Sequence, residues 1–172
     1  MYTDSVENLL MHNQFKDVCK FNNEELKHYN YFLEVVKLDE ILLENVIVIK
    51  GFVFFFVNAK DYFKTRKYLP HLRNKLSKKV VIVRNEKNFT KMLFSFFPDA
   101  YIHDIKYSYN KEKSQIEVNL DFLTGEEFAI GVGSKGEYLK VVNSLFNNHI
   151  ISQGLKIGVN IKLRKNFRYN FF

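Results

Sequence analysis

Two glycines three residues apart, Gly133 and Gly136, enclose Ser134 and Lys135 between two short helical patterns. Because glycine has no side chain, a glycine at each end of a loop lets the backbone approach a sugar-phosphate chain closely. The helix that follows offers unpaired N–H groups to an anion, and Lys135 adds a positive charge. The spacing is therefore suited to holding a nucleic-acid backbone, although it is also common in ordinary turns between helices.

The other reactive side chains form no catalytic or metal-binding pattern. Cys19 is the single cysteine, and no two histidines are four residues apart, so a zinc site lacks its ligands. No motif places a histidine or an acid where it would activate Ser134 as a nucleophile. We therefore expect no enzymatic activity, no catalytic residue, no metal and no cofactor. The histidines are scattered over the chain as His12, His28, His71, His103 and His149.

Positive charge is concentrated in the part of the chain that contains the glycine loop. Residues 1–45 carry nine acidic and four basic side chains, whereas residues 46–172 carry ten acidic and twenty-two basic ones. No acidic residue follows Glu137. Clustered positive charge attracts polyanions, because the neutralisation of phosphates releases counterions. The charge pattern favours a nucleic acid as the partner, the alternative being a solvated basic face without a ligand.

The spacing of the apolar residues predicts the same six elements twice, in the order helix, strand, strand, helix, helix, strand. Lys50-Gly51 indicates a tight hairpin turn, and Pro70 is typical of the first turn of a helix. The first series covers residues 24–36, 41–49, 52–57, two helices within 61–76 that divide near Tyr68, and 79–84. The second series begins about 62 residues later and covers residues 88–97, 102–109, 115–122, 126–131, 138–146 and 156–163.

An internal repeat of this length indicates an α+β protein of two consecutive small units, each a three-stranded sheet packed on helices. The predicted parts are an N-terminal extension (1–22), a first unit (23–85), a second unit (86–164) and a basic-aromatic tail (165–172). The extension can form an amphipathic helix that docks on a protein partner or on its own chain. The apolar side of that helix would consist of Val6, Leu9, Leu10, Met11 and Phe15.

Three segments, taken with their order, carry a resemblance to a known family. They are Asn23-Glu24-Glu25-Leu26-Lys27 through Phe32; Lys78-Lys79-Val80-Val81-Ile82-Val83 with Asn88-Phe89-Thr90 and Phe97-Pro98-Asp99-Ala100; and Glu127-Phe128-Ala129-Ile130-Gly131 with Gly133-Ser134-Lys135-Gly136. From about Asn22 to Leu163 the chain resembles the tandem KH domains of NusA-type transcription factors, in particular the short archaeal form. The resemblance implies two type II KH-like units, RNA binding on one extended surface, and a role in transcription elongation or termination.

The chain departs from this family in two places. The first unit lacks a GxxG loop, because the stretch from Asp61 to Tyr68 contains no glycine. That unit is then either a scaffold or keeps an electrostatic contact with RNA through a secondary basic patch. In the second unit, Gly131-Val132-Gly133 carries an extra residue, which leaves the alignment of its glycines open. The secondary basic patch consists of Lys64, Arg66, Lys67 and Arg73.

The expected RNA-binding residues are those of the GxxG loop and the cations that follow it in the chain. Tyr138 is included because an exposed ring next to the loop can stack on a base. The full set is Gly133, Ser134, Lys135, Gly136, Tyr138, Lys140, Lys162, Arg164, Lys165 and Arg168.

A second family shares the features of the second unit. Residues 89–146 are similar to the KH-bearing small-subunit ribosomal protein, and a cationic C-terminal end suits insertion between ribosomal RNA helices. The expected partner is therefore RNA within a large complex, either RNA polymerase or the small ribosomal subunit, and not a small molecule. The longest apolar stretch, Val46–Val57, is shorter than the roughly 20 residues of a membrane helix. We expect no membrane span and a location in the cytoplasm or in the matrix or stroma of an organelle.

Overall fold

The computed structural model describes residues 13–15, 20–152 and 158–165. The chain divides into two compact units, a first unit of residues 17–86 and a second unit of residues 87–172 together with residues 1–16. Each unit contains one three-stranded mixed sheet and three α-helices in its described part. The predicted α+β class is therefore confirmed.

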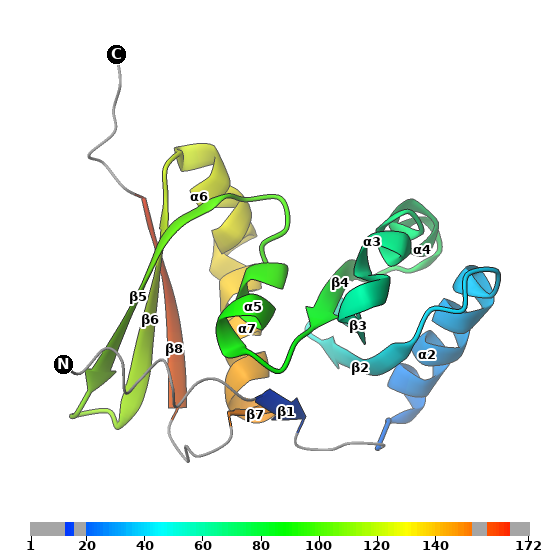
Figure 1. Cartoon of the computed structure of the whole chain (residues 1–172), viewed down its shortest axis with the longest axis horizontal. Coiled ribbons are helices and arrows are strands. Elements are labelled where there is room, and N and C mark those ends of the chain that lie inside the picture. Colours follow the sequence, from blue (N-terminus) through cyan, green and yellow to red (C-terminus); the bar gives the residue numbers. More distant parts are fainter. Residues whose placement is uncertain (1–12, 16–19, 153–157, 166–172) are drawn as a thin grey trace. The chain divides into compact units, whose positions relative to one another are not determined.

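The first unit has the element order helix, strand, strand, helix, helix, strand (Figure 1). In its sheet the strand order is β2-β3-β4, with β2 antiparallel and β4 parallel to the central β3. A short 3-10 turn, η1, follows β3. The elements are α2 (Asn23–Val36), β2 (Leu43–Ile49), β3 (Phe52–Asn58), η1 (Ala59–Asp61), α3 (Tyr62–Arg66), α4 (Leu69–Lys75) and β4 (Lys79–Asn85).

Local sequence accounts for the ends of these elements. Asn22 and Glu25 form a capping box at the start of α2, in which each side chain accepts a backbone N–H of the other residue (2.8 and 3.1 Å). Lys50 and Gly51 both have positive φ (45° and 83°), as a two-residue hairpin turn requires. Pro70 lies in the first turn of α4, where its missing N–H costs no hydrogen bond.

The three helices of the first unit share one core with its sheet. Phe32 of α2 packs against Phe55 of β3 with ring centroids 4.8 Å apart. Tyr62 of α3 and Leu72 of α4 belong to the same buried cluster. Burial of side chains of this size stabilises the unit by about 2–3 kcal/mol each.

His28 is a buried histidine in α2, and its environment predicts that the stability of the first unit depends on pH. Its side chain lies 4.0 Å from Glu24, and its Nδ1 has no hydrogen-bond partner among the described residues. Burial lowers the pKa of His28, an effect that Glu24 only partly offsets and that Lys78 reinforces. The neutral imidazole is therefore the form that the folded protein favours.

The free energy of unfolding is expected to decrease as the pH falls below about 6.5, because the unfolded chain then binds this proton more strongly than the folded protein. Above that pH both states are neutral at this position and the stabilisation is fully present. Chemical denaturation between about pH 7.5 and pH 5 measures the decrease. The variant His28→Gln should show a smaller pH dependence, and equal slopes for the two proteins would contradict the expectation.

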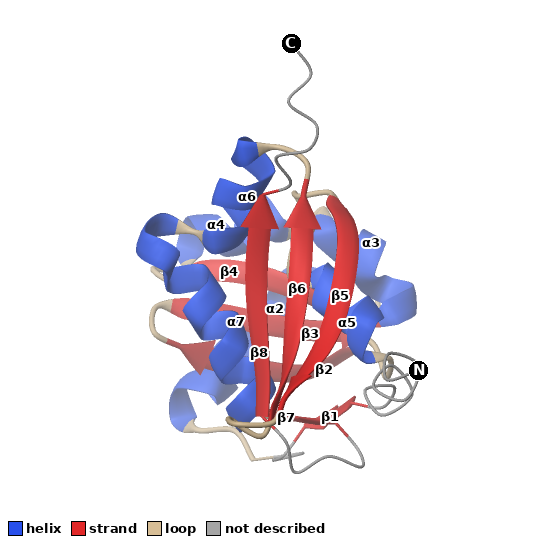
Figure 2. Ribbon diagram, turned by 90° about the vertical axis from the view of Figure 1, so that its left-hand side faces the viewer, coloured by secondary structure: helices blue, strands red, loops and turns tan. Residues whose placement is uncertain are grey.

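The second unit repeats the same order of six elements (Figures 1 and 2). Its strand order is β5-β6-β8, with β5 antiparallel and β8 parallel to the central β6. The helices α5, α6 and α7 cover one face of this sheet. The elements are α5 (Phe89–Ser95), β5 (Ile102–Asn110), β6 (Gln115–Phe122), α6 (Gly125–Val132), η2 (Ser134–Gly136), α7 (Glu137–Asn148) and β8 (Gly158–Lys165).

Alternation along β6 separates the two faces of this sheet. Ile116, Val118, Leu120 and Phe122 are buried at 2% exposure or less. The residues between them are polar, and side chains of neighbouring residues in a strand point to opposite faces. The apolar side chains therefore face the helices, where Phe146 of α7 packs against α5. The sheet face opposite the helices is polar.

Two short strands were not predicted from the sequence. β1 (Asn13–Phe15) pairs antiparallel with β7 (Ile150–Ser152). Asn13–Phe15 thus form a strand where a helix was expected, and the remainder of that proposed helix, up to residue 12, lies outside the described residues. β8 spans Gly158–Lys165 and so continues two residues beyond the end of the strand predicted at 156–163, whose first two residues lie outside the described part of the chain. No α-helix in the described part of the chain has the length and apolar character required to cross a membrane.

Candidate nucleic-acid interface

The GxxG loop connects α6 to α7 through a backbone that only glycine adopts easily. Gly133 ends α6 with φ 76° and ψ 174°, and Gly136 precedes α7 with φ 71° and ψ 13°. A Cβ atom on Gly133 would lie 2.6 Å from the Cβ of Tyr138. Gly133 therefore permits both the direction of the chain and its close approach to α7. Between the two glycines, Ser134 and Lys135 are exposed to solvent.

Tyr138 anchors the loop to the segment that follows α5. Its hydroxyl donates a hydrogen bond to the carbonyl oxygen of Phe96 (2.5 Å). Its ring meets that of Phe97 edge-on, with centroids 6.0 Å apart. The ring is half-buried, and these two contacts hold the first turn of α7 in place. Stacking on a base, as expected from the sequence, would use the part of the ring that remains exposed.

Positive charge and helix-terminal N–H groups meet at the start of α7. The N-cap residue Gly136 has no side chain that could cap the helix, and the N–H of Glu137 donates to the carbonyl oxygen of Ser134. The positive end of the α7 dipole therefore lies beside Lys135. Lys135 in the loop and Lys140 in the second turn are exposed, and neither forms an ion pair with another described residue. The carboxylate of Glu137 opposes them in the first turn.

The cations of β8 are divided between the two faces of the sheet. Val159 and Ile161 are buried toward the helices, so Lys162 and Arg164 lie on the polar face opposite them. Lys162 forms an ion pair with Glu117 of β6 (2.9 Å). This contact, together with a hydrogen bond from Asn110, lowers the pKa of Glu117.

Lys165, at the end of β8, is directed to the helix side. Its Nζ lies near Gly125 at the start of α6, at 3.2 Å from the position of a Cβ on that glycine. The expected site residues are thus brought together only in part. The loop, Tyr138, Lys140 and Lys165 share the helix side of the second unit, and Lys162 and Arg164 do not. Arg168 lies outside the described residues.

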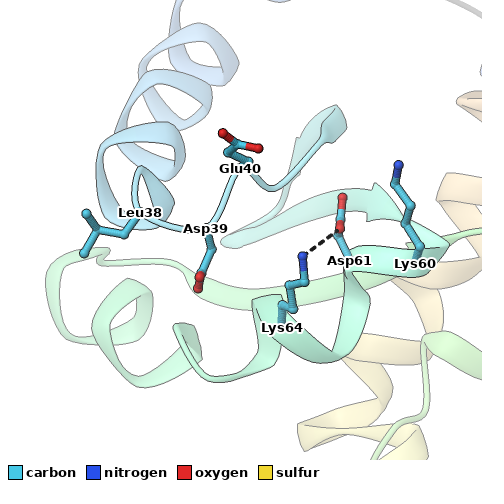
Figure 3. Close-up of a pocket in the computed structure, with 6 residues that line it drawn as sticks. All are labelled: Leu38, Asp39, Glu40, Lys60, Asp61 and Lys64. Carbon is cyan, nitrogen blue, oxygen red and sulfur yellow. Dashed lines mark ion pairs between the residues drawn. The ribbon is translucent and has the colours of Figure 1, made fainter.

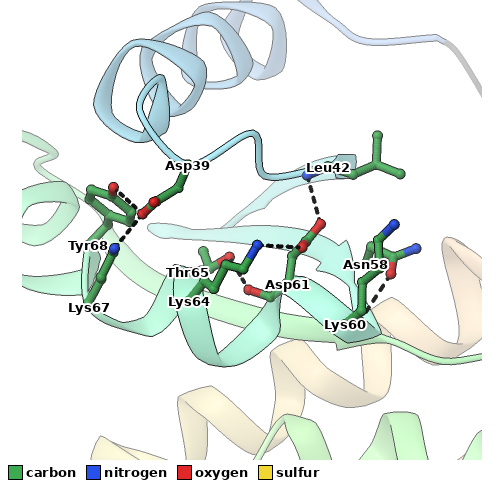
Figure 4. Close-up of polar contacts among 9 residues, drawn as sticks. All are labelled: Asp39, Leu42, Asn58, Lys60, Asp61, Lys64, Thr65, Lys67 and Tyr68. Atoms are coloured by element: carbon green, nitrogen blue, oxygen red, sulfur yellow. Dashed lines mark hydrogen bonds and ion pairs between the residues drawn. The ribbon is translucent and has the colours of Figure 1, made fainter.

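In the first unit, α3 and α4 correspond to α6 and α7, and a turn without a glycine loop joins them. Lys67 and Tyr68 join the two helices with ordinary right-handed helical φ and ψ, and no glycine is present. Asp39, in the loop after α2, accepts contacts from the Lys67 ammonium and from the Tyr68 hydroxyl (2.5 Å), as Figure 4 shows. The Lys67 contact, followed by that of Tyr68, lowers the pKa of Asp39, and Asp39 raises the pKa of Lys67.

A depression of about 540 Å³ lies beside this junction (Figure 3). Its floor contains Asp61, which is 4% exposed and accepts the backbone N–H of Leu42 (3.1 Å). The Nζ of Lys64 lies 3.7 Å from the same carboxylate. Two cations of the secondary basic patch, Lys64 and Lys67, are therefore each paired with a carboxylate. The depression is lined by Leu38, Asp39, Glu40, Lys60, Asp61 and Lys64.

The other two residues of the secondary basic patch lie on different helices. Arg66 is half-buried at the end of α3, and Arg73 is exposed on α4. The patch thus combines two cations paired with carboxylates and two arginines on successive helices. It provides a weaker attraction for phosphates than its sequence indicates, because nearby carboxylates offset part of its charge.

Two residues that the sequence analysis did not identify connect α7 to β8. The side-chain amides of Asn143 and Asn147 form hydrogen bonds with backbone groups of the strand. Asparagine is a poor helix former, so two asparagines four residues apart inside a helix were the signal that could have revealed them.

No protein-family model matches the chain, and no curated protein matches it. Among solved structures, the chain is similar to "Crystal structure of APE1850", with a TM-score of 0.57 and 15% sequence identity. The match covers 84% of this chain and 100% of that chain. At this level of identity, the likeness shows a shared fold and nothing more.

Proposed function

We propose that this protein binds single-stranded RNA without catalysing a reaction, as a divergent relative of the NusA-type tandem KH proteins. The observation that carries the proposal is the loop Gly133–Gly136. It joins two helices of an αββααβ unit and exposes Ser134 and Lys135 between two glycines of positive φ. In KH domains a loop of this kind clamps about four nucleotides.

The charges around the loop support the same proposal. A phosphate next to Ser134 would meet the positive end of the α7 dipole and the ammonium of Lys135, which forms no ion pair with another described residue. Glu137 weakens the positive potential of the helix end, so Lys135 supplies the larger share of the attraction. Lys140 extends the contact along α7. In the first unit, Lys64 and Lys67 are already paired with Asp61 and Asp39, so that unit is proposed to act mainly as a scaffold.

Replacing Ser134 and Lys135 with aspartate is expected to weaken the binding of single-stranded RNA at least about tenfold, or about 1.4 kcal/mol. The two carboxylates would repel the phosphates that the loop holds, and neither residue is buried. Fluorescence anisotropy with labelled RNA measures the affinity, and circular dichroism verifies that the fold is unchanged.

A matched control is available in the turn between β5 and β6. Lys111→Asp with Ser114→Asp changes the same residue types and the same net charge, at exposed positions of the same unit. Ser114 has φ 47°, a conformation that aspartate tolerates. If the control weakens binding as much as the loop variant does, the effect is one of overall charge. The loop would then be excluded as the binding site.

The proposed setting is a transcription complex. The alternative is a structural role in the small ribosomal subunit. One observation supports it: Lys162 and Arg164 lie on the face of the sheet opposite the helices and the GxxG loop. A protein embedded among RNA helices would use cations on both faces. Co-purification followed by a density gradient at high salt separates the two. A transcription factor is recovered with RNA polymerase, and a ribosomal protein sediments with the small subunit.

A further inference from the structure

β8 is an edge strand, because the strand order of the second unit is β5-β6-β8. One side of an edge strand carries backbone N–H and C=O groups that no neighbouring strand satisfies. These groups are available to any ligand or chain that approaches along the strand. How far they are open determines how much of β8 a bound molecule can contact.

Two asparagines of α7 form hydrogen bonds with outward-facing backbone groups of this edge. Asn143 accepts the N–H of Ile161 (2.7 Å) and donates to the carbonyl of the same residue (3.0 Å). Asn147 makes the same pair of bonds with Val159, accepting its N–H (2.9 Å) and donating to its carbonyl (2.7 Å). Each side-chain amide thus occupies the position that a peptide group of an added strand would take.

The periods of helix and strand explain why successive asparagines of α7 bond successive outward-facing residues of β8. Four residues of a helix rise about 6.0 Å, and two residues of a strand rise about 6.6 Å. Asn143 and Asn147 therefore stay in step with Ile161 and Val159. The Nδ2 of each amide also donates to the carbonyl four residues earlier, that of Leu139 (3.2 Å) or Asn143 (2.7 Å). Both N–H groups of each amide are thereby bonded.

The next pair of positions toward the GxxG loop has no asparagine. Four residues before Asn143 stands Leu139, and two residues after Ile161 stands Leu163. A leucine side chain forms no hydrogen bond, so Leu139 does not give the outward N–H and C=O of Leu163 the pair of bonds that Asn143 gives those of Ile161. Leu139 belongs to the first turn of α7, directly after Gly136. The pair Leu139 and Leu163 therefore lies at the end of the β8 edge that is nearest the GxxG loop.

We propose that Asn143 and Asn147 limit the contact of a bound RNA strand with β8. They close the edge at Val159 and Ile161, so a strand that runs from the loop along this edge finds no open backbone group beyond Leu163 in the direction of Val159. One base contacts the edge there, and the strand then leaves the surface. This inference rests on the proposed function, because it assumes that RNA is bound at the loop.

Amide hydrogen exchange followed by NMR tests the inference on the full chain, with and without an oligoadenylate of about eight nucleotides, twice the length that such a loop holds. In the free protein, the amides of Val159 and Ile161 are expected to exchange at least about tenfold more slowly than that of Leu163. The RNA is expected to slow exchange at Leu163 severalfold and to leave Val159 and Ile161 unchanged. In N143A/N147A, all three amides should exchange rapidly in the free protein and slowly with RNA.

Asn148→Ala is the matched control, since Asn148 lies on the same helix and its side chain bonds Ser144 instead of β8. It is expected to behave as the unaltered protein. Should N143A/N147A fail to fold, the exchange pattern of the unaltered protein with and without RNA still decides the question.

The outcomes separate this inference from the proposed function. Absence of RNA binding in the unaltered protein overturns both. Two outcomes overturn the inference alone. In the first, RNA binding depends on Ser134 and Lys135 but does not slow amide exchange at Leu163. In the second, RNA slows exchange at Val159, Ile161 and Leu163 both in the unaltered protein and in N148A. If N143A/N147A self-associates in light scattering and its opened edge gains no RNA protection, the two asparagines guard against strand addition and the inference is wrong.

Discussion

Replacing Gly133 with alanine is expected to lower the free energy of unfolding of the second unit by about 2–6 kcal/mol. Its φ of 76° with ψ of 174° is a region that is essentially restricted to glycine, where another residue costs about 1–3 kcal/mol. The added Cβ would also lie 2.6 Å from the Cβ of Tyr138, which forces the backbone to shift and adds about 1–3 kcal/mol. Because the shift displaces the start of α7, RNA binding should weaken as well.

Gly136 provides the control for this prediction. Its φ of 71° with ψ of 13° is ordinary left-handed helical backbone, and the nearest atom to an added Cβ is the Cγ1 of Val132 at 4.0 Å. Gly136→Ala should therefore cost only about 1 kcal/mol, from conformation alone. Chemical denaturation followed by NMR amide signals of each unit measures the two variants, since a chain of two units need not unfold in one transition. Equal losses for G133A and G136A would show that contact with Tyr138 does not constrain the loop.

Replacing Asp61 with alanine is expected to lower the free energy of unfolding of the first unit by about 2–3 kcal/mol. Its carboxylate is buried, accepts the N–H of Leu42 and pairs with Lys64, so it ties the loop after α2 to the start of α3. The substitution leaves the Leu42 N–H without its acceptor, at a cost of about 1–3 kcal/mol. It also leaves a small cavity in the floor of the depression.

Two further variants divide this effect into its parts. Asp61→Asn keeps an acceptor for the Leu42 N–H and should cost about half as much as Asp61→Ala. Lys64→Met removes only the exposed partner of the ion pair and should cost less than about 1 kcal/mol. Denaturation curves of the first unit measure all three. A loss below about 0.5 kcal/mol for D61A would mean that the loop is held by its packing and not by this carboxylate.

Local sequence signals predicted most of the secondary structure. Lys50-Gly51 and Pro70 act within a single turn of the backbone, so their effect is visible without the rest of the chain. The apolar periods of α7 and β6 are equally local. β1 and β7 escaped prediction because each has three residues and their pairing joins Phe15 to Ile150, which are far apart in the sequence. The end of β8 at Lys165, two residues beyond the predicted end, has the same origin, since pairing with β6 continues to that residue.

The sequence by itself determined the α+β class, the repeated element order and the glycine spacing of the loop, because these depend on residue type and on intervals of a few residues. Only the tertiary structure decided what surrounds that loop. It brought Tyr138 against Gly133 and Phe96, placed Lys162 and Arg164 on the other face, and paired Lys64 and Lys67 with carboxylates. It also aligned Asn143 and Asn147 with the edge of β8. Such contacts join residues from different elements, and their partners follow only from how the elements pack.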